Sequence, residues 1–301
     1  MKTVSILIPI FNRLNITKEG LDSLYISLKY YWEKGNNLIK YEVIVIDDGS
    51  NDGSSEWISN NYSDIILLKG DGNLWWSGAI NFGTEFAINK LKSDYVLLWN
   101  NDIFPSLNYF IILEEIVLDK KFFNSIIGSK ILIKGEENSI WSVGGFFNQY
   151  TGSFGMYDTI NSLNNEIYCD WQPGMGTLIP VSIIVNNNLW WDSKRFPQYH
   201  GDSDFTIRCK KAGLIILTYQ KLVIYNDLSS TGLTSRKNIK ELFLNLKSLK
   251  SNYNIYRDFL FYSKNGKIPL AYFGMLKKYY YYFGGYLKHN LFKRESSKQF
   301  D

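Results

Sequence analysis

Two groups of acidic and amide side chains in this sequence have the types and spacing that chemistry requires. Asn100, Asn101 and Asp102 directly follow the apolar run YVLLW, and their oxygen atoms suit a hard divalent cation. Asp202 and Asp204 stand two residues apart in HGDSDF, where one carboxylate could act as a general base. Each group also has a structural explanation, as the N-terminal cap of a helix. Neither motif alone decides between these explanations.

Short β-branched runs and helical stripes surround these motifs. TVSILIPI and YEVIVIDD are typical strands, and apolar residues recur between them at helical spacing from Leu21 to Trp32. DIILLKG and DYVLLWN repeat the pattern, with a helix expected over about 79–90. Strand, helix and strand in this order predict parallel pairing with right-handed crossovers.

The expected strand ends carry a common set of polar residues. FNR, DDGSNDGS, GDGNLWW and NND each follow a strand, and ligands collect at the carboxyl ends of strands in such sheets. DDGSNDGS by itself is also typical of an Asx-rich turn. Four such clusters at one edge favour a binding site there.

The pattern changes after the first hundred residues. From about Ser125 to Thr177, short strands, glycines and aromatic residues predict mixed antiparallel structure, followed by a helix over about 180–191. GDSDFTIRCKKAG predicts another helix, with Gly213 as its C-terminal cap. Beyond about Thr231 the sequence is helical, then basic and aromatic.

Composition is that of a soluble globular protein. Of 301 residues, 21% are charged and 45% hydrophobic, which excludes a disordered chain and a polytopic membrane protein. No stretch approaches the roughly 20 apolar residues of a spanning helix, and the N-terminal apolar run is interpreted as a strand, not a signal. Cys169 and Cys209 are expected to be packing residues in a reducing cytoplasm.

The C-terminal stretch combines aromatic and basic residues. YYYYFGGY is interleaved with six Lys and Arg against the single acid Glu295, namely Lys277, Lys278, Lys288, Lys293, Arg294 and Lys298. Such a segment can lie on an anionic membrane, here the inner face of the cell membrane, or can form an ordinary helical cap with a charged end. Nucleic acid is not an expected partner, because the core has no basic groove.

The ordered motifs resemble a known family. VSILIPIFNR, VIVIDDGSNDGS, GNLWWSGAINFG, WNND, PGMGTLIP and HGDSDFTIRCKKAG are similar, over about residues 3–230, to inverting family-two glycosyltransferases with the GT-A fold. The sequence looks most like enzymes that add sugars, including rhamnose, to bacterial capsule, O-antigen or cell-wall polysaccharides. The resemblance implies an α/β, mostly parallel doubly wound sheet with a small antiparallel addition. It also implies a nucleotide-binding half at about 1–105, an acceptor-binding half at about 106–230 and a helical extension at 231–301.

The resemblance also assigns roles by position. Residues against the nucleotide would be Pro9, Phe11, Asn12 and Arg13, with Asp48 accepting a hydrogen bond from the base. The donor-pocket residues would be Asn73, Trp76, Gly78, Asn81 and Asn101. Asp102 and Asn100 would hold Mg²⁺ or Mn²⁺ on the diphosphate, and Asp202 would be the catalytic base. Possible acceptor or auxiliary residues are His200, Asp204 and Asp227, although His200 could equally be part of a cleft wall. Of the two adjacent tryptophans, Trp75 and Trp76, only one is expected to face a ligand.

The chemistry of inverting transfer supports two separate acidic sites. Negative charge builds on the departing diphosphate while the anomeric carbon becomes oxocarbenium-like. A divalent ion stabilises the first, and a carboxylate on the opposite face takes the acceptor proton. Asp202 fits the second role better than Asp204, although the two could exchange roles. The expected substrates are a UDP- or dTDP-sugar and a glycan or lipid-linked acceptor.

Three positions depart from the family pattern. Asn100 stands where a second carboxylate is common, Gly201 where glutamate is frequent, and Asn226 with Asp227 where histidine is frequent. Asp227 is therefore a candidate metal ligand. The alternatives are a non-catalytic glycan-binding or scaffold protein, and a sugar nucleotidyltransferase. The latter is expected to carry a Gly-rich loop with Arg and Lys after the first strand, which IPIFNRLN does not contain.

Overall fold

The computed structural model describes residues 1–160, 164–228 and 238–298, except for the side chains of 137 and 289–298. The chain divides into two compact units, Met1–Phe146 with Gly155–Ser230, and Phe147–Phe154 with Thr231–Asp301. The domain boundary predicted after residue 230 lies within 229–237, outside the described residues.

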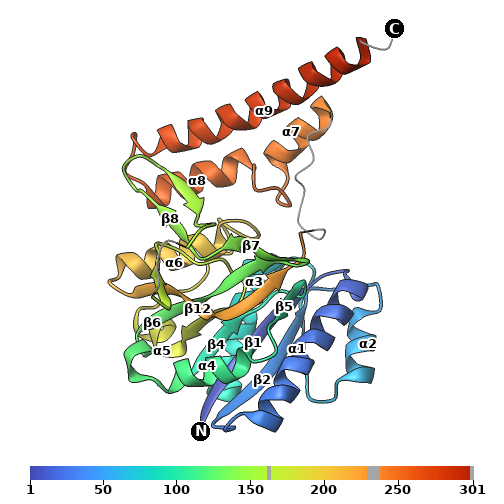
Figure 1. Cartoon of the computed structure of the whole chain (residues 1–301), viewed down its shortest axis with the longest axis vertical. Helices are drawn as coiled ribbons and strands as arrows, with labels where there is room; N and C mark the ends of the chain where they lie inside the picture. Colours follow the sequence, from blue (N-terminus) through green and yellow to red (C-terminus); the bar gives the residue numbers. More distant parts are fainter. Residues whose placement is uncertain (161–163, 229–237, 299–301) are drawn as a thin grey trace. The chain divides into compact units, whose positions relative to one another are not determined.

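The first part of the first unit alternates strands and helices, as predicted (Figure 1). Its elements are β1 (Lys2–Ile10), α1 (Leu14–Lys34), β2 (Ile39–Asp47), α2 (Ser54–Asn61), β3 (Ile66–Lys69), α3 (Trp75–Phe86), a π-helical turn (Ala87–Leu91) and β4 (Tyr95–Leu98). The four strands pair in parallel in the order β4, β1, β2, β3. Their carboxyl ends therefore meet at one edge.

The remainder of this unit extends the same sheet. Its elements are β5 (Ile103–Pro105), α4 (Tyr109–Leu118), a 3₁₀ turn (Lys120–Phe122), β6 (Ser125–Ile133), β7 (Glu136–Ser142), β8 (Gly145–Phe147), β9 (Phe154–Met156), β10 (Glu166–Tyr168), β11 (Thr177–Pro180), α5 (Val181–Asn186), α6 (Gly201–Lys211) and β12 (Ile215–Asn226). The strand order is β10, β12, β6, β11, β4, β1, β2, β3, and β11 runs antiparallel to β4. β8 and β9 form a small separate antiparallel sheet. This mixed α/β sheet with an antiparallel addition confirms the predicted fold class.

Two local predictions were wrong. The helix expected over about 180–191 ends at Asn186, and the chain then passes through Asn188 at a φ of 48°, which a helix cannot continue through. The alternative in which NND caps the next helix also fails, because β5 intervenes and Asn108 precedes α4. Gly213, in contrast, has the left-handed φ of 84° expected after the end of α6, and its N–H reaches the Lys210 carbonyl.

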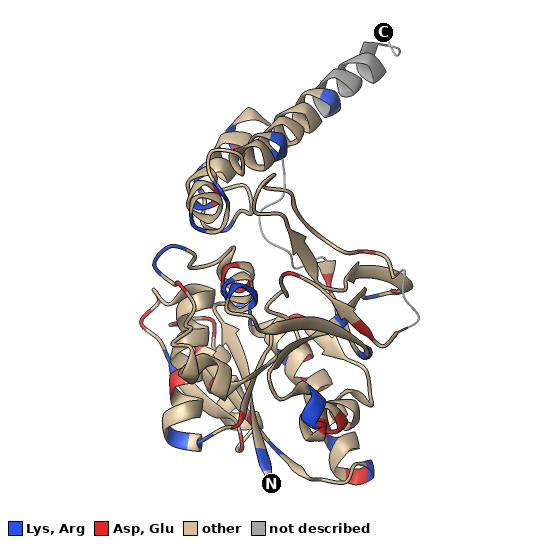
Figure 2. Cartoon of the chain, turned by 90° about the vertical axis from the view of Figure 1, so that its left-hand side faces the viewer, with Lys and Arg blue, Asp and Glu red and all other residues tan. Residues whose placement is uncertain are grey.

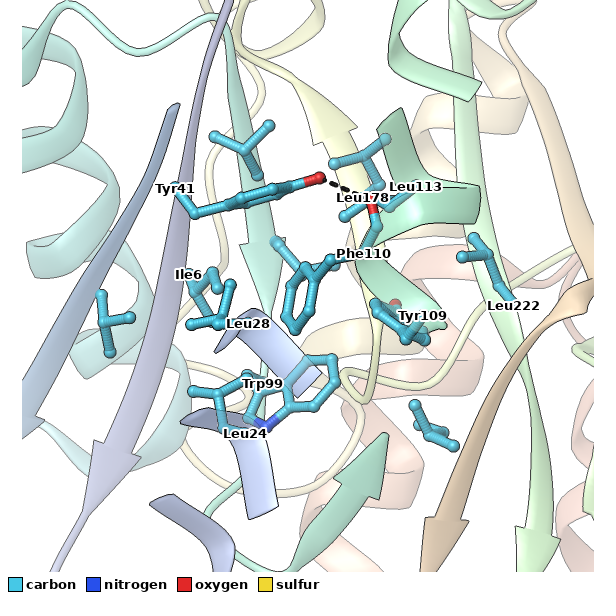
Figure 3. Close-up of a cluster of buried hydrophobic side chains, with 14 of the residues drawn as sticks. Ile6, Leu24, Leu28, Tyr41, Trp99, Tyr109, Phe110, Leu113, Leu178 and Leu222 are labelled. Carbon is cyan, nitrogen blue, oxygen red and sulfur yellow. Dashed lines mark hydrogen bonds between the residues drawn. The ribbon is translucent and has the colours of Figure 1, made fainter. Parts of the chain in front are cut away.

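Alternation along the strands divides the core between two faces of the sheet. Val4, Ile6 and Ile8 of β1 join one buried cluster with the apolar stripes of α1 and α4, whereas Leu7 joins a second cluster with α3 and α6. Figure 3 shows the first cluster, where Trp99 lies among the side chains of α1 and α4, and the Tyr41 hydroxyl donates to the Phe110 carbonyl at 3.0 Å. Cys169 and Cys209 are free, buried cysteines of the second cluster, as expected of packing residues. Helices thus cover both faces and leave the strand-end edge for other contacts.

Apart from the segment Phe147–Phe154, the second unit is helical where the structure describes it. It contains α7 (Ile239–Lys247), α8 (Ile255–Asn265) and α9 (Tyr272–Lys298). The Asn238 and Asn254 side chains cap α7 and α8 by accepting backbone N–H groups. Tyr279 and Tyr282 of α9 pack with Leu242 of α7 in a small buried cluster. Among the described residues, no helix combines the length and apolarity needed to cross a bilayer.

Candidate functional site

Loops at the carboxyl ends of β1 and β2 are bound to each other. The Asn12 N–H donates to the Ser50 hydroxyl at 2.9 Å, and the Asn12 side-chain oxygen accepts the Asn51 N–H at 2.8 Å. The Leu14 N–H, at the start of α1, donates to the Asp52 carboxylate at 2.8 Å. Asn12 has a φ of 49°, a conformation that asparagine tolerates better than most residues. These contacts fix the segment that contains Phe11, Asn12 and Arg13.

Asp48 organises the loop that follows β3. Its buried carboxylate accepts backbone N–H groups from Gly72 at 2.9 Å, Leu74 at 3.1 Å and Trp75 at 2.9 Å. Trp75 itself has a left-handed φ of 55°, an uncommon conformation for a bulky residue. The carboxylate therefore holds the turn that starts α3, and its predicted contact with a nucleotide base stays a prediction.

Trp76 lies between the two acidic motifs. Its indole N–H donates to the Asn100 side-chain oxygen at 3.1 Å. Its ring also lies against Gly174, where an added Cβ would stand 2.1 Å from a ring carbon. The Gly174 N–H in turn donates to the Asp202 carboxylate at 3.0 Å. One tryptophan thus connects NND to the candidate base, although these residues are far apart in sequence.

Asp202 and Asp204 occupy different environments. The Asp202 carboxylate accepts the backbone N–H groups of Gly174 and, at 2.7 Å, of Ser203. Burial raises the pKa of Asp202 above its ordinary value, and these two bonds and the charge of His200 oppose the rise only in part. Asp204 is completely buried, and its carboxylate pairs with the Arg208 Nε at 2.9 Å. The contacts therefore favour Asp202 as the base and give Asp204 a structural ion pair.

The segment before Asp202 is tightly packed. An added Cβ on Gly201 would stand 2.0 Å from the Ser77 hydroxyl oxygen, which donates to the Phe196 carbonyl at 2.6 Å. His200 has a left-handed φ of 66° and is nearly buried, with its ring against that of Phe196. The absence of a glutamate at position 201 thus has a steric explanation. His200 lies beside the candidate base, and its contact with an acceptor stays a prediction.

The candidate cation ligands lie at adjoining strand ends. Asp102 pairs with Arg13, whose guanidinium stands 3.1 Å from its carboxylate. Pairing of β5 with β12 brings Asp227 alongside, and its N–H points to the Asp102 carbonyl at 3.5 Å. Asp227 also lies 3.7 Å from Lys134.

The donor set suits a cation that arrives with a ligand. Within the described part of the chain, no group of three or more His, Cys, Asp or Glu could hold a metal ion. Asp102, with Asn100 two residues before it, supplies oxygen atoms, and Mg²⁺ commonly binds one or two carboxylates together with substrate phosphates. The residues present fit such a shared site and do not form a complete protein cage.

Several predicted donor-pocket residues have structural contacts. Asn81 exchanges two hydrogen bonds with the Trp191 backbone, at 2.8 and 3.1 Å, and so fixes the segment after α5. The buried Asn101 donates to the Thr17 hydroxyl at 2.8 Å and packs on α1. Asn73 lies in an exposed turn closed by the Asp71 carboxylate. These contacts hold Asn81 and Asn101 in place, and their predicted contact with a donor stays a prediction.

Three other predicted residues lie in β1, just beyond it, and in α3, namely Pro9, Phe11 and Gly78. Gly78 has room for a methyl group, since an added Cβ would come no closer than 3.4 Å to Leu74. Pro9 pairs in register with Ile46 inside the sheet, and Phe11 is exposed just beyond β1. Sequence reasoning did not identify Ser77 as part of the site. Its only sequence signal is its position between Trp76 and Gly78, within a motif already considered.

Two solved structures resemble this fold. TarS of S. aureus, residues 1–349 in complex with UDP, matches with a TM-score of 0.50 and 13% identity, over 76% of this chain and 61% of that one. The chain thus spans about three fifths of that TarS structure. The mannosyltransferase PcManGT of Pyrobaculum calidifontis, in complex with GDP-Man and Mn²⁺, matches with a TM-score of 0.56 and 13% identity, over 93% of this chain and 69% of that one. At this identity the likeness concerns the fold.

A search of curated proteins found no match. The model of glycosyl transferase family 2 matches residues 5–174. This match includes every strand-end motif of the sheet edge and ends at Gly174, which binds the candidate base. Because it extends over more than half of the chain, the chain belongs to glycosyl transferase family 2.

Proposed function

We propose that this chain transfers a sugar, with inversion, from a nucleoside diphosphate sugar to a hydroxyl of a glycan or lipid-linked saccharide. The observation that carries the proposal is the link from Asn100 through Trp76 and Gly174 to Asp202. It holds NND and the candidate base together at one sheet edge, in a chain of this family. The neighbours' complexes with UDP and with GDP-Man and Mn²⁺ support a nucleotide-sugar donor. We favour a UDP- or dTDP-sugar and a role in bacterial surface polysaccharide synthesis.

Asp202 is the base in this proposal. As the acceptor oxygen bonds to the anomeric carbon, its proton moves to the Asp202 carboxylate and the bond to the diphosphate breaks. Burial raises the pKa of Asp202, which makes the carboxylate a stronger base than an exposed aspartate. The N–H groups of Gly174 and Ser203 orient it.

Asp102, Asn100 and Arg13 serve the departing diphosphate. A divalent cation, Mg²⁺ or Mn²⁺, would supply positive charge to the leaving group when bound beside Asp102 and Asn100, with Asp227 as a further candidate ligand. Arg13 pairs with Asp102 and contributes a fixed positive charge at the same place. Trp76 orients Asn100 through its indole N–H.

The test compares Asp202→Asn with Asp158→Asn, which changes an exposed acid in the same unit. Release of nucleoside diphosphate from a panel of nucleotide sugars is measured with saccharide acceptors. We expect Asp202→Asn to lower kcat by roughly 10²- to 10⁴-fold, the usual contribution of a general base. Asp158→Asn should retain full activity. Equal activity of both variants and the unmodified chain would refute the role of Asp202.

Donor binding is measured separately, by thermal stabilisation with UDP, dTDP, GDP and CMP, each with and without Mn²⁺. A nucleotide at about 100 times its dissociation constant stabilises the folded state by roughly 2.7 kcal/mol. We expect one of these nucleotides to do so in a metal-dependent way that Asp102→Ala abolishes and Asp202→Asn leaves intact. Nucleotide binding without turnover of any donor would instead support a non-catalytic scaffold.

A further inference from the structure

Helix α9 has two apolar faces, of which only one is buried. On the inner face, Met275, Tyr279, Tyr282 and Tyr286 belong to the small core of the second unit. The opposite face carries large apolar side chains that are 58–74% exposed, namely Phe273, Leu276, Tyr280, Tyr281 and Leu287. Their spacing of three, four, seven and eight residues places them on one stripe. We call this stripe the outer face of α9.

This exposure is unusual for a helix in water. A surface helix normally presents polar residues opposite its buried stripe, and a helix that is apolar all round is normally covered. Contiguous exposed apolar side chains mark interaction sites more often than free surface. The outer face of α9 therefore has the character of a binding surface.

The charges around this surface favour an anionic partner. Lys277 and Lys288 lie exposed on the same stripe. Between residues 238 and 288, the unit carries nine Lys and Arg against two acids, Glu241 and Asp258. Asp258 is buried and paired with Lys278, so it offers little negative charge at the surface. Figure 2 shows Lys and Arg in blue along these helices.

We propose that the outer face of α9 binds the surface of an anionic lipid bilayer. Tyrosines with an apolar ring and a polar hydroxyl favour the headgroup level, where Tyr280 and Tyr281 would lie with Phe273 and Leu276 inserted more deeply. Lys277 and Lys288 would contact anionic headgroups. Of the other basic residues in the stretch from Lys277 to Lys298, Lys278 pairs with Asp258, and Lys293, Arg294 and Lys298 lie outside the described side chains. The proposal does not use them.

A second copy of the chain is the less favourable occupant. A symmetric dimer through this face would bring two strongly basic surfaces together, and like charges brought close oppose association. An anionic bilayer instead neutralises the same charges. Membrane binding does not depend on catalysis, although it would bring the chain to a lipid-linked acceptor.

The test uses the full chain with sedimented vesicles of phosphatidylcholine alone or mixed with phosphatidylglycerol. We expect binding to the mixed vesicles, at least tenfold weaker binding to the neutral ones, and weakening as salt rises. Tyr280→Glu with Tyr281→Glu should lower binding to mixed vesicles at least tenfold. A separate variant, Lys277→Glu with Lys288→Glu, should lower binding to mixed vesicles by a larger factor, since each basic residue contributes roughly a fivefold gain in affinity.

Matched controls separate this surface from general effects. Ile26→Glu changes an equally exposed apolar residue of α1, and Lys90→Glu reverses an exposed charge in the first unit. Both should bind vesicles like the unmodified chain, as should Asp202→Asn, whose catalytic defect is independent. Vesicle binding is compared only among variants whose thermal stability matches that of the unmodified chain.

Three results would overturn the proposal. The first is equal binding to neutral and anionic vesicles, and the second is a loss of binding in the Ile26→Glu control as large as that in the tyrosine variant. The third is a dimer in solution that the tyrosine substitutions dissociate, which would show that a second copy covers this face. None of these results would affect the proposed transfer reaction, because no donor or acceptor is present in the test.

Discussion

Gly201→Ala tests whether close packing beside Asp202 sets the position of the candidate base. The added Cβ would stand 2.0 Å from the Ser77 hydroxyl oxygen and 3.1 Å from the Phe196 carbonyl oxygen. Ser77 is completely buried, and its hydroxyl is held by the 2.6 Å bond to that same carbonyl. Either α6 must therefore shift at its first turn or the hydroxyl must leave its partner.

The free energy of unfolding should fall by about 1–5 kcal/mol. Alanine in place of glycine in a helix contributes up to about 1 kcal/mol of stability. Against this, overpacking a buried site costs roughly 1–3 kcal/mol, and leaving a buried carbonyl or hydroxyl unpaired costs a further ~1–3 kcal/mol. The unfavourable contributions exceed the favourable one, and kcat should fall because Asp202 follows directly.

The assay is urea unfolding, analysed as a double-mutant cycle with Ser77→Ala. Ser77→Ala removes the oxygen that the new methyl group would meet, so the double variant should be more stable than the sum of the single changes predicts, by about 1–2 kcal/mol. Gly78→Ala is the matched control, since its new Cβ would come no closer than 3.4 Å to any neighbour and should not destabilise. Additivity of the two single changes within about 0.5 kcal/mol, or a neutral Gly201→Ala, would refute the reasoning.

Three further predictions follow from the contacts of single side chains. Because burial raises the pKa of Asp202, kcat/KM should fall with decreasing pH at a higher pH than an exposed aspartate would give, and a pH–rate profile without this acid limb would contradict the assignment. Trp76→Phe keeps a ring against Gly174 but removes the bond to Asn100, so it should lower the free energy of unfolding by about 1 kcal/mol and also lower kcat, as measured by urea unfolding and donor turnover. Glu114→Gln should cost roughly 2 kcal/mol at neutral pH, because the Tyr31 hydroxyl and a backbone N–H donate to the buried carboxylate. Burial acts to raise the pKa of Glu114, but these bonds outweigh it and lower the pKa, so the difference in stability between the variant and the unmodified chain should disappear as pH falls through that pKa.

The sequence alone was sufficient for the parallel half of the fold. The β-branched runs TVSILIPI and YEVIVIDD, and the helical stripe between them, are set by residues close together in the chain, and β1, α1 and β2 follow them closely. Convergence of the polar motifs at one edge was also predictable, because parallel strands end on the same side of a sheet. The end of α5 at Asn186 was not predictable, since Leu189, Trp190 and Trp191 resume the apolar pattern in a loop where Trp191 is buried and bound by Asn81.

Only the tertiary structure distinguished residues of the same chemical type. The sequence favoured Asp202 over Asp204 in HGDSDF but left an exchange of roles open, whereas in the structure Arg208 pairs with Asp204, and Gly174 from a separate loop binds Asp202. Likewise, NND could have capped a helix until β5 separated it from α4. Sequence patterns record neighbours along the chain, whereas burial, ion pairing and pKa depend on atoms that are brought together from distant positions. The sequence therefore determined the sheet and its polar edge, and the packing of distant segments decided what each side chain at that edge can do.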